Sequence, residues 1–326
     1  MIPLDSIRGF FPPELRAPAF SRHVLKEYVE CLALDWIARS PWARRLTFIG
    51  GTCLRLTMDV DRFSEDLDFD CKGMDADSFR AFTDALVAHL ANNGLSAAAR
   101  DRESPRLSAF RRSIVFPGLL RDLGLSAFRE ERFLMKIEAQ DQGVPYERRN
   151  ATIRRCGFFF PVPVPPEPVL CAMKLSALLS RGKGRDFYDA MFLLQRTPPD
   201  YAFLSRRHPD VRDAASLKAA LAEKADSTDL ALKRRDVEHL LFHRENATRI
   251  ERFRDFVATL ASRHAESRGG RIPRGERGGR GAKTSRGVRG VRGVPRRAGR
   301  VSRNCGKVWE MRFRGSKGLT RPAAFR

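Results

Sequence analysis

The sequence predicts a mixed α/β (α+β) fold, in which a small sheet domain precedes a helical domain and a basic tail. Up to about residue 160, period-two and helical apolar patterns alternate, which is typical of strands mixed with helices. Beyond that point the pattern is helical, and after residue 264 it gives way to Gly-Arg steps. We therefore expect an irregular N-terminal arm (1–18), a sheet domain (19–165), a helical domain (166–264) and a disordered tail (265–326).

The sheet domain is expected to begin with a helix and two short strands. Apolar residues recur at helical spacing from Val24 to Ile37, and Pro41 ends that helix. Residues 46–49 form a short apolar run that predicts a strand. The run 66–70 alternates aspartate with apolar residues, which predicts a strand with one buried face.

Further elements follow in chain order. Residues 77–90 show helical periodicity and are followed by the stop signal Asn92-Asn93-Gly94, and the runs 107–116 and 133–139 predict strands. The proline-rich run 160–166 is expected to break regular structure and to mark the domain boundary. The later helices are expected at 168–180, 186–195, 214–225 and 235–262.

Most of the positive charge lies in the tail. The formal net charge is +22, and residues 265–326 contain 19 Lys and Arg against 3 Asp and Glu. The same segment holds 13 of the 24 glycines, so it cannot bury enough apolar surface to offset the entropy of ordering, and we expect disorder there. The rest of the chain is only mildly basic, so its charge alone does not indicate nucleic-acid binding.

The cysteines and the apolar runs exclude several classes of protein. None of the six cysteines forms a Cys-x-x-Cys pair, so no zinc knuckle or disulfide framework is predicted. No secretory hydrophobic region follows the first residues, and no run approaches about 20 apolar residues. These features predict a cytoplasmic protein with reduced thiols and no membrane span.

Two aspartates in the predicted strand 66–70 have a spacing that suits metal ions. Residues i and i+2 of a strand point to the same face, so Asp66 and Asp68 lie side by side. Mg²⁺ prefers carboxylates and phosphate oxygens, and two such ions about 3.5–4 Å apart can hold the attacking and leaving oxygens of a phosphoryl transfer. A lone Asp-x-Asp, however, is most often a pair of solvated surface acids.

Two glycines follow the predicted strand 46–49, and they add a candidate phosphate-binding feature to the aspartate pair. Gly50 and Gly51 allow backbone N–H groups to approach a phosphate closely. Thr52 adds a hydroxyl donor, and Arg55, about one turn further on, is expected to reach a phosphate. A lone Gly-Gly is usually a turn, but Gly-Gly placed before Asp-x-Asp is a rarer combination, which favours a site for phosphates and metal ions.

The same segments resemble a known family. Residues 50–55 (Gly-Gly-Thr-x-Leu-Arg) and 62–69 (Arg-Phe-Ser-Glu-Asp-Leu-Asp-Phe) resemble the first motif of the AbiEii/AbiGii toxin family of nucleotidyltransferases. Residues 174–189 (Lys-Leu-x-Ala-Leu-x-x-Arg-x-Lys-x-Arg-Asp-Phe-Tyr-Asp) resemble its later motif. The resemblance covers about 20–194 and is specific, because two separate motifs occur in the right order; it does not extend to the tail.

The resemblance implies a polymerase-β-like nucleotidyltransferase of bacterial phage defence. Such proteins are toxins of abortive-infection and type IV toxin–antitoxin systems, which implies a cognate antitoxin encoded nearby. The implied reaction transfers NMP from an NTP, GTP among the candidates, under Mg²⁺ or Mn²⁺. The implied acceptor is RNA, with the 3′ end of tRNA as the preferred guess.

The resemblance also implies roles for individual residues. The fold usually presents a third carboxylate from a later strand, and Glu138 is the candidate. The catalytic set is then Asp66, Asp68, Glu138, Lys174 and Asp186, and its first three members are the metal ligands. The residues expected to contact the nucleotide are Gly50, Gly51, Thr52, Arg55, Ser64, Lys174, Arg181, Lys183 and Asp189.

Several of these residues also have a plainer interpretation. Glu138 can be a surface acid at the end of a strand. Asp186 and Asp189 lie three residues apart and share one helix face, so either can orient Lys183 or Arg185, or receive a salt bridge.

Two other patterns are interpreted as structural. His239 and His243 have the i,i+4 spacing of a zinc site, but no Glu lies between them, so they predict a packed helix face. The run Phe158-Phe159-Phe160 is expected in the core rather than in a base-stacking platform.

Two alternative functions remain open. An RNA-binding protein would act through its Gly-Arg tail, because such segments bind RNA backbones electrostatically. A degenerate transferase would act only through protein contact with an antitoxin, but the intact acidic pair argues against this. The sequence does not predict an oligomeric state.

Overall fold

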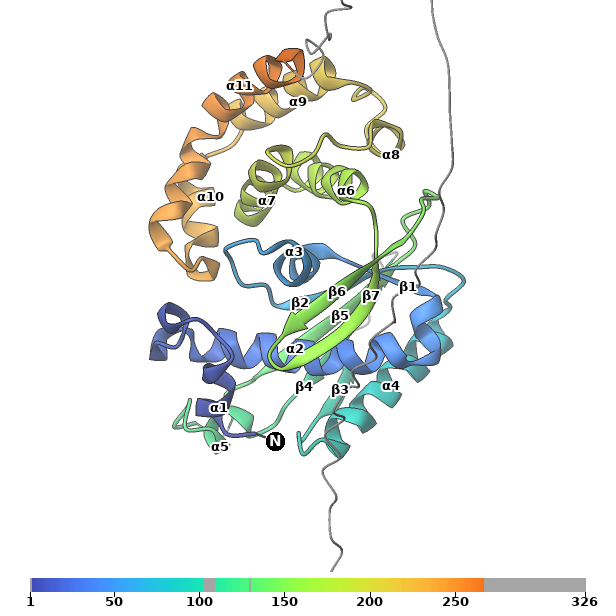
Figure 1. Ribbon diagram of the computed structural model, residues 1–326, viewed down its shortest axis with the longest axis vertical. Helices are drawn as coiled ribbons and strands as arrows, with labels where there is room; N and C mark the ends of the chain where they lie inside the picture. The colour runs from blue at the N-terminus through green and yellow to red at the C-terminus, as the bar shows by residue number, and fades with distance from the viewer. Residues whose placement is uncertain (1, 102–108, 129, 267–326) are drawn as a thin grey trace, which may run out of the picture. The chain divides into compact units, whose positions relative to one another are not determined.

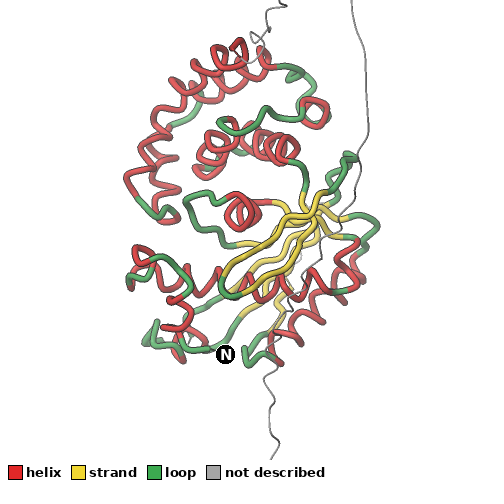
Figure 2. Tube along the Cα trace, in the orientation of Figure 1, coloured by secondary structure: helices red, strands yellow, loops and turns green. Residues whose placement is uncertain are grey.

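The described part of the chain is built around a five-stranded mixed sheet. The computed structural model describes residues 2–101, 109–128 and 130–266, which lie in one compact unit. The strand order of this sheet is β1-β2-β5-β4-β3; Figure 2 draws all strands, including those of a second, two-stranded sheet, in yellow. Strands β2 and β5 are parallel and the other neighbours are antiparallel, which confirms the mixed fold. The strands are β1 (Leu46–Ile49), β2 (Asp66–Cys71), β3 (Ala98–Asp101), β4 (Phe110–Val115) and β5 (Leu134–Gln140).

Two helices cover one face of this sheet (Figure 1). The helices α2 (Ser21–Arg39) and α4 (Ala76–Asn92) confirm two predicted helices, and their Trp36 and Phe82 rings stack at 6.4 Å. The side chain of Asp75 caps α4 by accepting a 2.7 Å hydrogen bond from the Ser78 amide. These helices leave the opposite face of the sheet to the candidate site.

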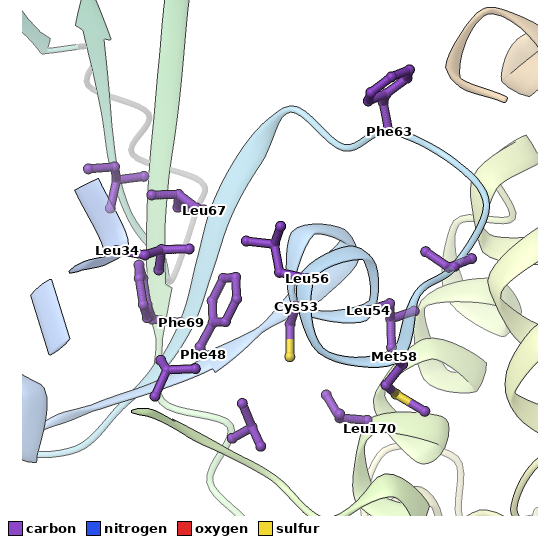
Figure 3. Close-up of a cluster of buried hydrophobic side chains, with 14 of the residues drawn as sticks. Leu34, Phe48, Cys53, Leu54, Leu56, Met58, Phe63, Leu67, Phe69 and Leu170 are labelled. Carbon is purple, nitrogen blue, oxygen red and sulfur yellow. The ribbon is translucent and has the colours of Figure 1, made fainter. Parts of the chain in front are cut away.

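The core lies between α2, the sheet and a short helix α3 (Gly50–Met58). Phe48 and Phe69 are partners across β1 and β2, and their ring centroids are 5.7 Å apart. Figure 3 shows Leu34 beside these rings and Leu54 on α3. Each fully buried side chain of this size contributes about 1.5–3 kcal/mol of burial free energy, which holds β2 rigidly in place.

The chain departs from prediction directly after β1. No helix was predicted between the first two strands, but Gly50 and Gly51 are the first residues of α3. Tertiary packing explains the helix, because Cys53, Leu54 and Leu56 are buried. The N-terminal arm also differs, since it contains the helix α1 (Leu4–Gly9) and buries Ile7 in the core.

The proline-rich run expected to break regular structure is a strand. β6 (Arg149–Arg155) and β7 (Phe158–Val164) form a two-stranded antiparallel hairpin. Pro161 and Pro163 are two residues apart, so both of their missing N–H groups face the same edge of β7, away from β6. A strand with one free edge tolerates proline there, so the predicted break is wrong.

The region after β7 is helical, as predicted. The expected helices 168–180, 186–195 and 214–225 are confirmed, whereas the short helix α8 (Tyr201–Ser205) and, before β5, the short helix α5 (Leu119–Asp122) were not predicted. The change from strands to helices falls inside one compact unit, and the domain division at 165 stays a prediction. The remaining helices are α5 (Leu119–Asp122), α6 (Glu167–Ser180), α7 (Gly184–Leu194), α8 (Tyr201–Ser205), α9 (Ala214–Asp226), α10 (Leu230–Val237) and α11 (Phe253–Glu266).

The single helix expected at 235–262 is wrong. Between α10 and α11 the chain forms two 3₁₀ segments, Glu238–Leu240 and Arg244–Arg252. The backbone between them pairs with the loop before β2: the Phe63 amide donates to the Leu240 carbonyl at 2.8 Å, and the Phe242 amide donates to the Asp61 carbonyl at 3.3 Å. These bonds require non-helical backbone.

Two sequence expectations change as a result of these elements. His239 lies in the first 3₁₀ segment and His243 directly precedes the second, so they share no helix face. Within the run at 158–160, Phe160 is buried as expected, but Phe159 is 66% exposed. The Gly-Arg segment lies outside the described residues. Among those that are described, no helix is long and apolar enough to cross a membrane.

Candidate active site

The two predicted metal-binding aspartates lie on one face of β2. Leu67 and Phe69 point into the core, so strand alternation places Asp66 and Asp68 together on the opposite face. On the parallel neighbour β5, the residue opposite Asp68 is Glu138. The structure thus brings the three predicted carboxylates to one surface of the sheet.

Basic residues alternate with these carboxylates across the strands. Lys136 lies opposite Asp66, and its Nζ is 3.5 Å from Asp66 Oδ1. On β4, Arg111 lies opposite Glu138 and donates to both of its carboxylate oxygens, from Nε at 2.8 Å and from Nη2 at 2.9 Å. This fork geometry is the strong form of an arginine–carboxylate pair.

A cavity of about 250 Å³ opens above this face of the sheet. Among the described residues that line it, seven are basic and three are acidic, so its lining is suited to a polyanion. The lining residues are Gly51, Arg62, Ser64, Asp66, Asp68, Arg111, Ser113, Lys136, Glu138, Lys174, Arg181, Lys183 and Arg185.

The two glycines of the first motif are required by close packing. Gly50 has φ +83°, and a Cβ there would lie 2.1 Å from Asp68 Oδ2. A Cβ on Gly51 would lie 2.6 Å from Ser64 Oγ and 2.7 Å from Arg62 Nη2. Glycine therefore lets the start of α3 approach the acidic strand, and it leaves the backbone of Gly51 on the cavity wall.

Two residues of the same motif are placed elsewhere. Thr52 is fully buried, and its hydroxyl donates to the Asp66 carbonyl at 2.6 Å. Arg55 donates to both Glu27 oxygens, at 2.8 and 3.2 Å, and stacks on the Phe242 ring at 4.6 Å. Because 50–58 is a helix, these side chains fasten α3 to β2 and α2 and do not line the charged cavity.

A buried cluster joins the two motifs. Arg62 is fully buried and donates to both oxygens of Asp189, at 2.7 and 2.8 Å. The ammonium of Lys174 lies 2.8 Å from Asp189 Oδ2. Burial alone would raise the pKa of Asp189, but the adjacent cations hold it well below the usual range. Asp189 therefore stays ionised and positions two cations at the cavity wall.

Asp186 organises a second group of cations. Its oxygens accept two hydrogen bonds from Arg181, each at 2.9 Å, and one from the backbone N–H of Lys183 at 3.1 Å. Burial opposes ionisation of Asp186, but these bonds hold its pKa below the usual range. Both aspartates of the helix thus receive salt bridges, and the turn before α7, together with the first turn of α7, brings Arg181, Lys183 and Arg185 to the cavity.

The pKa of the Asp68 carboxyl is raised. Burial raises its pKa to about 6, with further increases from the nearby Glu138 and Asp66 carboxylates, while Lys174 acts in the opposite direction. A cation placed between Asp66 and Asp68 would remove this like-charge repulsion.

Two of the three acidic residues in the cavity are placed to bind a divalent cation. Asp66 and Asp68 are oxygen donors on one face of one strand and line one cavity, which is the donor chemistry that Mg²⁺ and Mn²⁺ take. Both oxygens of Glu138 are bound by Arg111. Within the described ranges, no group of three or more His, Cys, Asp or Glu is arranged to hold a metal ion. The aspartate pair fits, whereas Glu138 would first have to leave Arg111.

Several residues of the cavity were not predicted. Arg62 stands in the quoted first motif, and Lys136 lies two residues before Glu138, so strand alternation alone places it on the same face. Arg185 stands inside the second motif. Nothing in the sequence indicated that Arg111 and Ser113 belong to the cavity, because the sequence does not show the register between β4 and β5.

A second cavity of about 330 Å³ adjoins the charged one and shares Asp68, Glu138, Lys174 and Arg181 with it. Its other walls come from the ends of β1, β2 and β5, from α6 and from α8. The described residues that line only this cavity are Ile49, Gly50, Phe69, Ala109, Gln140, Gln142, Leu170, Met173, Ser176, Ala177, Ser180, Phe203 and Arg207.

The chain was compared with known families and structures. Residues 32–267 match the family model described as nucleotidyl transferase AbiEii toxin, type IV TA system. A search of curated proteins finds no match. A similar solved structure is MenT4, a nucleotidyltransferase toxin from Mycobacterium tuberculosis H37Rv, with 18% identity over 80% of this chain and 90% of that one, at a TM-score of 0.51. This likeness supports the fold.

Two further structures are from Helicobacter pylori. JHP933 is 16% identical, over 75% of this chain and 95% of its own length, with a TM-score of 0.44. A putative nucleotidyltransferase is also 16% identical, over 75% of this chain and 96% of its own, with a TM-score of 0.47.

Proposed function

Because the chain belongs to the AbiEii family of type IV toxin–antitoxin nucleotidyltransferases, we propose that it transfers NMP from an NTP to an RNA hydroxyl. The 3′ end of tRNA is the proposed acceptor, and GTP is the first donor to test. One observation carries the proposal: the acidic pair Asp66 and Asp68 faces a cavity lined by seven basic side chains. This combination suits a triphosphate that must be held and neutralised.

The triphosphate is assigned to the basic side of the cavity. Lys183 and Arg185 line it and have no ion pair with any described residue, so they are free to bind phosphate oxygens. Arg62 and Lys174 are fixed by Asp189 and supply positive charge from the wall. Fixed cations stabilise developing negative charge without reorganising, which is the main source of catalysis in phosphoryl transfer.

Asp66 and Asp68 would hold Mg²⁺ or Mn²⁺, which neutralises charge on the reacting phosphate and its leaving group. The acceptor hydroxyl oxygen forms a bond to the α-phosphorus, and the bond from that phosphorus to the pyrophosphate oxygen breaks. Glu138 accepts the hydroxyl proton once Arg111 has released it. The products are the NMP-modified acceptor and pyrophosphate.

The toxin–antitoxin assignment implies a cognate antitoxin as the protein partner. We propose that its gene lies beside that of the toxin and that both act in the cytoplasm in defence against phage. Co-purification of the chain with the product of the adjacent gene tests this pairing.

A transfer assay tests the reaction. The protein is incubated with Mg²⁺, total tRNA and each labelled NTP in turn, beside the Asp66→Ala/Asp68→Ala variant. Label on tRNA with the wild type, and its reduction by at least about a hundredfold in the variant, are expected, because the variant lacks the metal ligands. Equal labelling by a folded variant would contradict the metal assignment, and label on protein would change the acceptor.

A further inference from the structure

We propose that Arg111 keeps Glu138 occupied until a triphosphate binds the arginine side chain and so releases the carboxylate. The inference rests on the proposed transfer reaction, in which Glu138 accepts the proton of the acceptor hydroxyl. One of the arginine–carboxylate pairs at the charged cavity, Arg111 with Glu138, differs from the others in its exposure to solvent.

Two of these pairs are anchored in the protein interior. Arg62 and Asp189 are both fully buried, and the Asp186 side chain that holds Arg181 is fully buried as well. Taking the cation away from a buried carboxylate leaves an uncompensated charge, which is strongly destabilising. The partners in these two pairs are therefore fixed.

The pair of Arg111 and Glu138 lies on the open wall of the cavity. The two side chains are 37% and 25% exposed, and both line the cavity. Water can solvate either partner when the pair opens, so the pair can exchange its partners with little loss of stability. The backbone ladder holds β4 against β5, so the register of the sheet does not require this side-chain contact.

Arg111 occupies both oxygens of Glu138. Its Nε lies 2.8 Å from Oε1, and its Nη2 donates to Oε2 at 2.9 Å. Asp66, in contrast, has a single contact, with the Lys136 ammonium at 3.5 Å. A hydroxyl or a metal ion that approaches Glu138 must therefore compete with the guanidinium, whereas Asp66 is accessible.

A triphosphate has the chemistry to open this pair. The planar guanidinium fork matches a phosphate group as well as it matches a carboxylate. Lys183 and Arg185 line the same cavity and have no ion pair with any described residue, so they attract the polyanion to it. When Arg111 moves to a phosphate oxygen, Glu138 is released. The proton acceptor then becomes available only when the nucleotide is present.

A double-mutant cycle in metal-free buffer tests this exchange. Calorimetry measures the binding of inorganic tripolyphosphate to the wild type, Arg111→Gln, Glu138→Gln and the double variant, and thermal unfolding checks that each is folded. Because Glu138 competes for the guanidinium, Arg111→Gln should weaken binding by no more than about twofold when Glu138 is present. In the Glu138→Gln background the same substitution should weaken binding by about tenfold or more.

Arg185→Gln in the same two backgrounds is the matched control, because Arg185 lines the cavity and is not bonded to Glu138. It should weaken binding by the same factor in both. Equal factors for Arg111→Gln in the two backgrounds would overturn the proposal and leave the pair as a surface salt bridge. Tripolyphosphate binding that does not depend on Arg111 in either background would also overturn it.

These binding measurements need no turnover, so they separate the exchange from the reaction. The expected coupling in a protein that transfers no nucleotide would overturn the proposed function and keep the exchange between carboxylate and phosphate. Equal factors in a protein that does transfer nucleotide would overturn the exchange alone.

Discussion

At the scale of single residues, the site depends on carboxylates whose pKa values are shifted in opposite directions. Asp189 and Asp186 are kept ionised by adjacent cations and hold those cations in place. Asp68 is half-buried. Desolvation, together with the Glu138 and Asp66 carboxylates, raises its pKa to about 6 and leaves it in need of a cation. The first arrangement stabilises the fold, whereas the second costs stability and suits metal binding.

Asp189→Ala is expected to destabilise the protein by about 3–5 kcal/mol, because it leaves the fully buried Arg62 without its counterion. The pKa of Asp189 is lowered, so its contribution is fully present above about pH 3.9 and is lost as the pH falls further. Urea unfolding measures the change. The exposed Asp77→Ala is the control and should cost less than about 1 kcal/mol, and equal costs for both variants would contradict a role for the cluster.

Asp68→Asn should raise stability while abolishing transfer. Because the folded-state pKa of Asp68 is raised to about 6, the cost of ionising it begins above the unfolded-state value of about 3.9 and is complete above about pH 6. Asparagine removes that cost. A gain of about 1 kcal/mol is expected near pH 8, and it should fall to a small fraction of that near pH 4, where the folded-state carboxyl of the wild type is protonated and the unfolded-state carboxyl is about half protonated. The free energy of unfolding of both proteins, measured at the two pH values without metal, checks the sign of this change. A gain that is the same at both would exclude ionisation as its cause.

At the scale of elements, the glycine at the start of α3 controls how close this helix lies to β2. Gly50→Ala is expected to cost about 1–3 kcal/mol and to reduce transfer sharply, because φ is +83° and the added methyl would meet Asp68. Gly9→Ala, which has nothing within 4 Å of its added Cβ, is the control. Unfolding and transfer assays on both variants test this, and full activity of Gly50→Ala would show that Asp68 has room to move.

Periodicity predicted those elements whose apolar faces are regular. The strands β1, β2, β4 and β5 and the helices α2, α4, α6, α7 and α9 were all expected close to their observed bounds. Helix α3 was missed because Gly-Gly is a poor helix start in isolation, and β7 because proline is excluded from all but edge strands. The break after α10 depends on pairing with a distant loop, which no local pattern records.

Similar reasoning explains which site residues could be predicted. Asp66, Asp68, Glu138, Lys174, Arg181 and Lys183 line the charged cavity, and strand alternation or motif position pointed to each of them. Thr52 and Arg55 do not line it, because a helix turns them towards β2 and α2. The register of β4 against β5 places Arg111 in the charged cavity, and only the folded sheet defines that register.

At the scale of the whole molecule, charge is divided between the folded unit and the terminal segment. Deleting 267–326 removes all 19 basic residues counted beyond residue 264. Affinity for tRNA should fall, and the slope of log affinity against log salt should become shallower, by about 0.7 for each lost phosphate contact on a single strand. Turnover at saturating tRNA should remain. Filter binding at several salt concentrations and a transfer assay test this; lost turnover would assign catalysis to the segment.

The backbone pairing between the loop 61–63 and the segment 240–242 has a practical consequence. The acidic pair lies before Pro165, whereas Lys174, Asp186 and Asp189 lie after it, and Arg62 meets its counterion only across that point. Two polypeptides cut between Pro165 and Pro166 would each lack part of the charged cavity. Reassembly would restore it, so the fold offers a design for a split toxin whose activity depends on bringing two silent halves together.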